Sequence, residues 1–198
     1  DFSSPLHNKF FRNEDYMLYI MRHGKTEWNA LHKIQGRTDI PLNEEGRLMA
    51  LKAHEEYKSW NIDVCYCSPL IRAVETAQIV LKNRGIPIIT DERLVEMSFG
   101  DYEGIENSFK IPDCPINLIF RKPEEYIESI GGAETFAELF ARTGSFLKEV
   151  IEPQLQEGTD ILIVGHGAMN SSIICQVKNK PIEEFWSAGL EQCKILQL

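Results

Sequence analysis

The sequence predicts an α/β fold of three layers, in which a mostly parallel sheet lies between two layers of helices. Short apolar runs rich in branched residues alternate along the chain with segments of helical periodicity. No internal repeat, low-complexity segment or Pro/Ser/Gly-rich linker divides the 198 residues. A chain of this length can bury one substantial core, so we expect a single α/β domain over residues 1–198.

Five segments have the pattern of strands. Four are short apolar runs flanked by Gly, Pro or charged residues, as is typical of strands buried on both faces: Met17–Met21, Val64–Cys67, Ile86–Ile89 and Ile161–Val164. The closing run Cys193–Leu198 predicts a last strand.

Three segments between these strands have the pattern of helices. Asn43 is expected to cap a helix that runs to about Lys58, and Ser68-Pro69 to cap and begin a second helix. The apolar face of that second helix is Ala73, Val74, Ala77, Val80 and Leu81. A third helix is expected from Glu134 to about Val150, with an inward stripe of Phe136, Phe140, Thr143, Leu147 and Val150. Glu183–Trp186 suits a short turn.

Two segments stand apart from this alternation. The stretch from Glu96 to Gly132 is the least regular, and we expect residues 97–132 to form a lid insertion beside a functional site. Residues 1–15 lack the apolar core and cleavage site of a signal peptide, and we interpret them as an N-terminal extension.

Composition excludes several classes of function. The net charge of −9 argues against a nucleic-acid surface, and no apolar run approaches the length of a membrane span. The five cysteines are odd in number and contain no CxxC pair, so neither a disulfide framework nor a zinc site is expected. We interpret them as small buried groups and infer a reducing, cytoplasmic setting.

Two of the predicted strands end in the same way. The first leads into Arg22-His23-Gly24 and the fourth into Gly165-His166-Gly167. In an open parallel sheet, ligands bind in the crevice beyond the carboxyl ends of the strands. If the two strands are neighbours, His23 and His166 face each other across that crevice. A glycine after each histidine leaves room for a ligand to approach the backbone closely.

A further cation points to the class of ligand. Arg72 falls in the first turn of a predicted helix, where a positive charge opposes the helix dipole and does not stabilise the helix. Together with Arg22 and the two imidazoles it would form a compact cationic pocket in an acidic protein. Guanidinium groups bind phosphate through paired hydrogen bonds, so the expected ligand carries a phosphate.

Phosphate binding alone is compatible with an interaction module, whereas catalysis needs a nucleophile and an acid. A neutral histidine is a competent nucleophile toward phosphorus. No HExxH pattern, carboxylate-rich loop or Walker glycine motif is present, so we expect no metal and no cofactor.

The chain resembles a known family, the histidine phosphatase superfamily, which is also called the phosphoglycerate mutase-like family. The resemblance runs from about Met17 onward and rests on five motifs in order: Arg22-His23-Gly24-Lys25-Thr26 with Trp28-Asn29; Gln35-Gly36 with Asp39-Ile40-Pro41-Leu42; Ser68 to Ala77; Glu96 with Gly100-Asp101-Tyr102-Glu103-Gly104; and Gly165-His166-Gly167. It implies the three-layer phosphoglycerate mutase-like fold.

The resemblance also assigns roles. His23 is implied as the nucleophile that becomes phosphohistidine, and Glu96 as the acid that protonates the leaving alkoxide and later activates water. The residues implied to bind the phosphoryl group are Arg22, Asn29, Gln35, Arg72, His166 and Gly167.

The family contains both phosphatases and mutases. The apolar run Met97-Ser98-Phe99 after Glu96 resembles the phosphatase branch, whereas Arg121-Lys122 in the lid region would suit the second anion site of a mutase. We therefore expect a metal-independent phosphomonoesterase acting on a small phosphorylated metabolite. A 2,3-bisphosphoglycerate-dependent mutase and a non-catalytic phosphate-binding module are the alternatives.

The sequence departs from the family pattern at two places. Lys25 stands where a glutamate or glutamine is usual, and it would either add charge to the pocket or point outward. Met169-Asn170-Ser171 stands where many relatives carry an arginine. Neither departure removes a residue with an implied catalytic role.

Overall fold

A sheet of five strands in the order β3-β2-β4-β1-β5 organises the computed structural model, which describes residues 16–198. The strands are β1 (Leu18–Arg22), β2 (Val64–Cys67), β3 (Ile88–Thr90), β4 (Ile161–Gly165) and β5 (Ile195–Gln197). The first four are parallel to their neighbours, and only the edge strand β5 runs antiparallel, against β1. All five predicted strands are present, with the third and fifth shifted or shortened by two or three residues.

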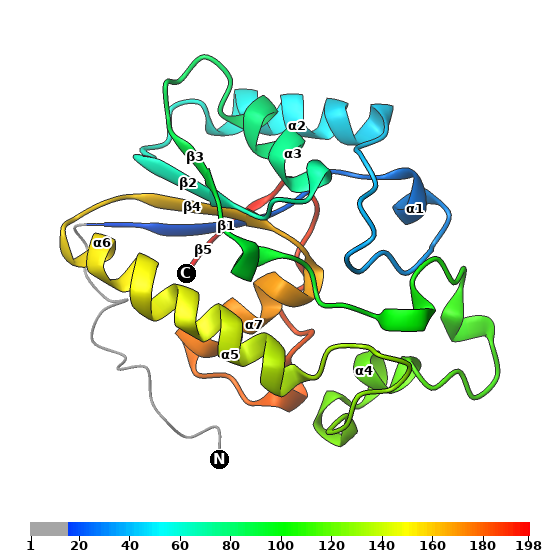
Figure 1. Cartoon of the computed structure of the whole chain (residues 1–198). Coiled ribbons are helices and arrows are strands. Elements are labelled where there is room, and N and C mark those ends of the chain that lie inside the picture. The colour runs from blue at the N-terminus through cyan, green and yellow to red at the C-terminus, as the bar shows by residue number, and fades with distance from the viewer. Residues whose placement is uncertain (1–15) are drawn as a thin grey trace.

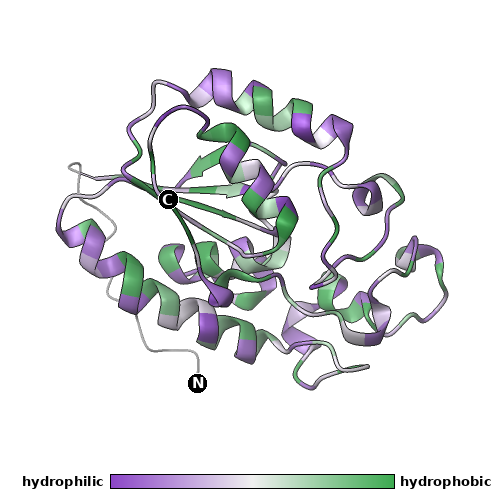
Figure 2. Ribbon diagram, turned by 45° about the horizontal axis from the view of Figure 1, so that its top comes forward, coloured by the Kyte–Doolittle hydropathy of each residue, from purple (hydrophilic) through white to green (hydrophobic). Residues whose placement is uncertain are grey.

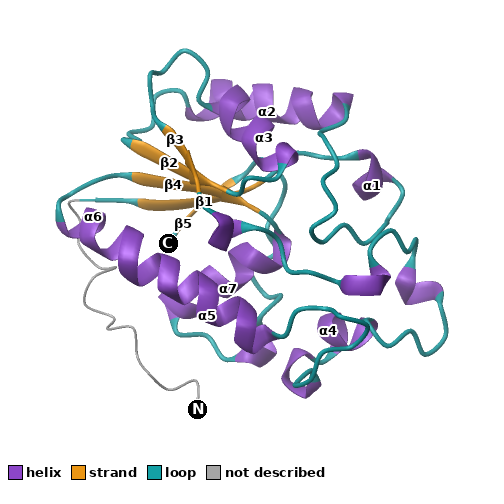
Figure 3. Ribbon diagram, in the orientation of Figure 1, coloured by secondary structure: helices purple, strands orange, loops and turns teal. Residues whose placement is uncertain are grey.

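Two layers of helices cover the sheet, as Figures 1 and 3 show. The helices are α1 (Glu27–Ala30), α2 (Glu44–Tyr57), α3 (Ile71–Val80), α4 (Asn117–Arg121), α5 (Phe136–Phe146), α6 (Glu152–Gln156) and α7 (Gly167–Lys178). Helices α2 and α3 lie on one face, and α5, α6 and α7 lie on the other. The predicted three-layer α/β/α sandwich is confirmed.

The core explains this layering, because successive side chains of a strand point to opposite faces of the sheet. In β4, Leu162 and Val164 pack toward α2 and α3, while Ile161 and Ile163 pack toward the other layer. Every residue of β1, β2 and β4 is buried, apart from the half-exposed Arg22. Apolar residues accordingly follow the strands of the central sheet in Figure 2.

The boundaries of two helices differ from expectation. Helix α3 begins at Ile71 with Leu70 as its cap, and the Ser68 hydroxyl instead accepts a hydrogen bond from the Leu70 N–H at 3.2 Å. The helix expected over Glu134–Val150 is α5 followed by one π-helical turn, Leu147–Ile151, and then α6.

That π turn moves the buried stripe along the helix. Because a π turn inserts an extra residue per turn, Phe146 and Leu147 both face the core, and Ile151 replaces Val150 as the next buried position. Phe140, also expected inward, is only half-buried.

Residues 97–132 leave the sandwich beyond the carboxyl ends of the strands (Figure 1). They form α4 and several 3₁₀ turns, and their apolar residues Phe99, Ile116, Ile119 and Tyr126 belong to a cluster that they share with α5 and α7. This segment, which we call the insertion, contains the residues predicted to form a lid, and that role stays a prediction. The predicted N-terminal extension, residues 1–15, lies outside the described residues.

Candidate active site

The ends of β1 and β4 bring the two histidines together. These strands are adjacent and parallel, with Arg22 paired to Gly165, and the His23 N–H donates to the Gly165 carbonyl at 2.9 Å. The residues that follow this pair are therefore neighbours as well. The imidazole rings of His23 and His166 lie edge to face, with their centroids 5.2 Å apart.

Hydrogen bonds hold the ring of His23 in one tautomer. Its Nδ1 lies 2.6 Å from the carbonyl oxygen of Gly24, which can only accept, so Nδ1 carries the proton. Its Nε2 accepts a hydrogen bond from Nε of Arg72 at 3.3 Å. Burial, together with the charges of Arg72 and Arg22, holds the pKa of His23 well below its usual value. His23 is thus neutral at physiological pH, with a lone pair on Nε2.

Arg72 is fully buried at the start of α3, and backbone carbonyls fix its guanidinium group. It donates to the carbonyl of Gly36 at 2.7 Å and to that of Thr38 at 2.9 Å. The carboxylate of Glu103 in turn holds this loop by accepting from the N–H groups of Arg37 and Thr38. The motif residue Glu103 therefore supports Arg72 through the loop of residues 36–38.

Three buried nitrogens beside His23 make no hydrogen bond within the described part of the chain. They are Nε of Arg22 and both ring nitrogens of His166. Burial is the main cause of the lowered pKa of His166, and the charge of Arg72 adds to it. A buried polar group without a partner is costly, and an anion with several acceptor oxygens satisfies such groups. The arrangement therefore fits a phosphoryl group.

Two neutral amides lie beside these groups. The hydroxyl of Thr26 lies 3.1 Å from Oδ1 of Asn29 and 2.9 Å from Oε1 of Gln35, and Nε2 of Gln192 also donates to Oδ1 of Asn29. Since the oxygens of both amides face protein donors, their NH₂ groups are the ends left for an anion. Thr26 also caps α1 in a reciprocal capping box with Asn29.

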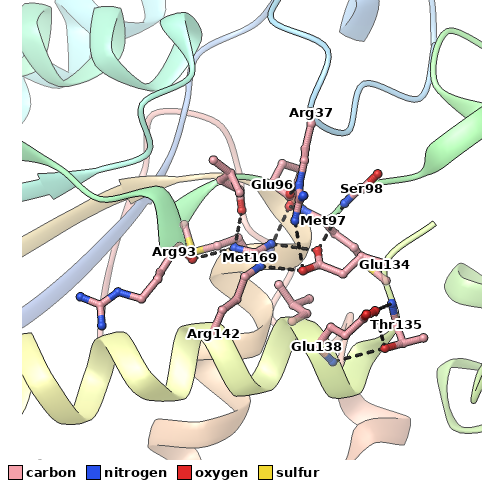
Figure 4. A network of polar contacts seen from close by, with 12 residues as sticks. Arg37, Arg93, Glu96, Met97, Ser98, Glu134, Thr135, Glu138, Arg142 and Met169 are labelled. Carbon is pink, nitrogen blue, oxygen red and sulfur yellow. Dashed lines mark hydrogen bonds and ion pairs between the residues drawn. The ribbon is translucent and has the colours of Figure 1, made fainter. Parts of the chain in front are cut away.

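Glu96 is buried at the junction between the insertion and α7, and backbone donors hold its carboxylate. Oε1 accepts from the N–H groups of Met97 at 2.8 Å and Met169 at 2.9 Å, and Oε2 accepts from Ala168 at 3.2 Å (Figure 4). Two of these donors belong to the first turn of α7, where the helix dipole favours a negative charge.

A buried ion pair clamps the segment that carries Glu96. Arg142 of α5 makes a two-pronged contact with Glu134, at 2.7 and 2.9 Å, and donates its remaining nitrogen to the carbonyls of Arg93 and Val95 (Figure 4). Arg37 also contacts Glu134, at 3.2 Å, and donates to the carbonyl of Glu96. The backbone on either side of the carboxylate is therefore fixed.

The two glycines that follow the histidines serve different purposes. A Cβ at Gly24 would lie 2.7 Å from the carbonyl oxygen of Gly46, so this glycine allows α2 to pack closely, and it does not line the pocket. The expectation that Gly24 makes room for a ligand is therefore wrong. Gly167 does line the pocket, and a Cβ there would come within 4 Å of Glu96 and Arg22.

One cavity of about 980 Å³ brings the predicted site residues together. His166, which is fully buried behind the lining, is the one predicted catalytic or phosphate-binding residue that does not line it. The others all do: Arg22, His23, Asn29, Gln35, Arg72, Glu96 and Gly167. The insertion contributes the other side of the cavity with Phe99, residues 107–110 and Phe120.

Lys25 and Asn170, at the two departures from the family pattern, and the basic pair Arg121-Lys122 do not line this cavity. Lys25 forms an ion pair with Glu45 at 2.7 Å, and Lys122 forms one with Glu125 at 2.6 Å. The guanidinium group of Arg121 lies over the ring of Phe109. Asn170 is buried and ties α7 to β1 by donating to the carbonyl of Met21. None of these four residues lines the cavity.

Sequence patterns missed Thr26, Glu103, Glu134 and Arg142 as supporting residues. A threonine three residues before Asn29 is a recognisable capping pattern and could have identified Thr26. The other three act through contacts between residues far apart in the sequence, which no local pattern shows. Within residues 16–198, no group of three or more His, Cys, Asp and Glu is placed to hold a metal ion.

Known proteins are similar to this chain in sequence and in fold. The model of the histidine phosphatase superfamily (branch 1) matches residues 18–198. A 2,3-bisphosphoglycerate-dependent phosphoglycerate mutase of Cytophaga hutchinsonii is 32% identical, over 76% of this chain and 72% of its own. Phosphoserine phosphatase 1 of Hydrogenobacter thermophilus is 26% identical, over 88% of this chain and 82% of its own.

Among solved structures, YhfR of Bacillus stearothermophilus superimposes on this chain with a TM-score of 0.82 and 30% sequence identity. The match covers 92% of this chain and 90% of the YhfR chain. The extent of the family match agrees with the motifs and with the geometry of the two histidines. The chain belongs to the histidine phosphatase superfamily.

Proposed function

We propose that this protein is a metal-independent phosphomonoesterase that acts through a covalent phosphohistidine on His23. The single observation that carries the proposal is the state of His23, a buried neutral imidazole with its proton fixed on Nδ1. Around its Nε2 lie two arginines and a second histidine, which suit the charge of a transferring phosphoryl group. Relatives named as phosphatases support a small phosphorylated substrate.

The reaction has two steps. In the first, Nε2 of His23 attacks phosphorus, the bond from phosphorus to the ester oxygen breaks, and Glu96 transfers its proton to the leaving alkoxide. In the second, Glu96 takes a proton from water, the oxygen of that water attacks phosphorus, and the bond from phosphorus to Nε2 breaks. Inorganic phosphate leaves, and both residues return to their starting states.

A phosphoglycerate mutase is the second candidate, because one relative with 32% identity carries that name. A mutase must hold and reorient a bisphosphorylated intermediate, which requires a second anion site. The basic pair of the insertion does not supply that site, since Lys122 pairs with Glu125 and Arg121 packs on Phe109. This arrangement favours the phosphatase.

The state of the cysteines bears on the cellular setting that we propose. The described cysteines are free thiols, and burial raises the pKa of Cys67 and Cys193 to about 12, so they suit a reducing, cytoplasmic setting. No helix among residues 16–198 is long and apolar enough to cross a membrane.

The experiment that tests the proposal measures the release of phosphate from p-nitrophenyl phosphate in EDTA. We expect turnover by the wild type and loss of turnover in His23→Ala, because the nucleophile is gone. His54→Ala is the matched control, since His54 lies on α2 outside the cavity. Full activity of His23→Ala would contradict the mechanism. No hydrolysis by the wild type would direct attention to a mutase assay primed with 2,3-bisphosphoglycerate.

A further inference from the structure

The part of the cavity beyond the phosphate site is lined by aromatic rings. Phe99, Phe109, Phe120 and Trp186 all contribute to the walls. The ring of Phe120 lies at the centre of this group, with its centroid 5.6 Å from Phe99, 5.5 Å from Phe109 and 5.4 Å from Trp186. We call these four residues the aromatic wall.

The aromatic wall presents carbon surfaces and little hydrogen-bonding capacity. The indole N–H of Trp186 is the one polar side-chain group of the aromatic wall, and it already donates to the carbonyl of Ile119 at 2.9 Å. Phe99 is buried, and Phe120 and Trp186 are half-buried. Phe109 is 55% exposed, which is unusual for a phenylalanine and leaves its ring accessible from the cavity.

The ring of Phe109 is held in place although it is exposed. The guanidinium group of Arg121 lies over it, 5.5 Å from the centroid, and Phe120 contacts it from within the wall. A ring ordered in this way loses little freedom when a ligand packs against it.

The charged groups described at the rim of the cavity are either exposed or already in contact with another side chain. Lys110 and Glu191 are exposed and opposite in sign. The ammonium group of Lys33 lies over the ring of Trp28, 5.8 Å from its centroid. Recognition of a substrate carboxylate at an enclosed site requires a positioned cation, as Arg22 and Arg72 are positioned for phosphate.

Resting on the proposed phosphatase activity, we propose that the preferred substrates are phosphate monoesters of alcohols that carry an uncharged aromatic ring. The phosphoryl group binds between His23 and the two arginines, and the ring of the leaving alcohol packs on Phe109 and Phe120. Offset or edge-to-face contacts with such rings add to the gain from burying apolar area. This class differs from amino-acid phosphates and phosphoglycerates, whose leaving groups are charged.

The test compares 2-phenylethyl phosphate with propyl phosphate, because their alcohols have similar acidity and only the ring differs. We expect the wild type to have a kcat/KM at least about ten-fold higher for 2-phenylethyl phosphate, the ratio that one aromatic contact supports. Phe109→Ala should remove most of this preference by raising KM, with kcat within about two-fold, because the ring binds away from the reacting atoms.

Ile127→Ala is the matched control, since Ile127 is a large apolar residue of the same insertion, 80% exposed and outside the cavity. It should keep the wild-type preference. Hydrolysis of both esters with equal kcat/KM, or faster hydrolysis of phosphoserine or 3-phosphoglycerate than of 2-phenylethyl phosphate, would overturn the proposed substrate class alone. Failure to hydrolyse these esters and p-nitrophenyl phosphate would overturn the phosphatase proposal, and the substrate class with it.

Discussion

The position of the proton on the imidazole of His23 decides which ring nitrogen can act as a nucleophile. The carbonyl of Gly24 fixes that proton on Nδ1, and burial keeps the ring neutral, so Nε2 carries the lone pair, which accepts from Arg72 in this structure and would attack phosphorus when a substrate binds. The same burial leaves nitrogens of Arg22 and His166 without protein partners. At the residue scale, the site therefore combines a ready nucleophile with unsatisfied donors for the group it attacks.

Replacement of Glu96 should affect substrates according to their leaving group. In Glu96→Gln the side chain cannot donate a proton, so we expect kcat/KM for alkyl phosphates, which reports the first step alone, to fall by about 100-fold or more, a loss typical of general acid catalysis. Nitrophenolate leaves without protonation, so kcat/KM for p-nitrophenyl phosphate should fall by less than about ten-fold. Steady-state kinetics on both esters measure the difference, and an equal loss on both would contradict the role of Glu96 as the acid.

At the scale of elements, α5 and α7 together position that carboxylate. The first turn of α7 donates two N–H groups to Glu96, and Arg142 of α5 holds the carbonyls on its N-terminal side. The pair of Arg142 with Glu134 keeps the guanidinium group in place. The acid is thus fixed by two helices, of which α7 also reaches the cavity through Gly167.

Arg142→Ala should mimic Glu96→Gln in a weaker form. Loss of the clamp frees the backbone beside Glu96, so we expect kcat/KM for alkyl phosphates to fall by about ten-fold and kcat/KM for p-nitrophenyl phosphate to change little. Arg47→Ala is the matched control, because Arg47 pairs with Glu75 outside the cavity. If Arg142→Ala lowered both rates equally, its effect would be structural rather than one of positioning.

The elements also show which parts of the molecule the sequence could predict. The strands β1, β2 and β4 are apolar runs with clear ends, so the strand-end residues Arg22, His23 and His166 could be placed correctly. Helix α7 was not predicted, because every residue from Ala168 to Cys175 is buried and no polar face marks a helical period.

The same physical reason limits the prediction of the site. Local patterns do not mark Glu96 as a site residue, and only the family resemblance implied its role, since two of its three backbone donors come from α7, 72 and 73 residues further along the chain. The π turn after α5 likewise depends on packing against the sheet, so helical periodicity alone gave the wrong inward position at Val150.

At the scale of the whole molecule, the site makes folding depend on pH. His23 and His166 are buried with a pKa well below the usual value, so the unfolded chain binds more protons than the folded one below about pH 6.5. This stability is fully present above the pKa of the unfolded histidines and is lost as the pH falls. Each histidine adds a slope of up to about 1.4 kcal/mol per pH unit.

We therefore expect the free energy of unfolding to fall between about pH 6.5 and pH 5, where few carboxylates titrate. Urea denaturation in buffers without phosphate or sulfate measures this slope. The double variant His23→Asn with His166→Asn should flatten it. A wild-type slope that matches that of the double variant would show that the two rings do not titrate as their burial requires.

The central claim is that the phosphoryl group passes through a bond to Nε2 of His23. The most direct measurement mixes enzyme with p-nitrophenyl phosphate, quenches within one turnover in alkali, where phosphohistidine survives, and locates the phosphoryl group by peptide mass spectrometry. The account predicts a phosphoryl group on His23 in the wild type and none in His23→Ala. Turnover with no phosphorylated His23, or with the group on another residue, would contradict it.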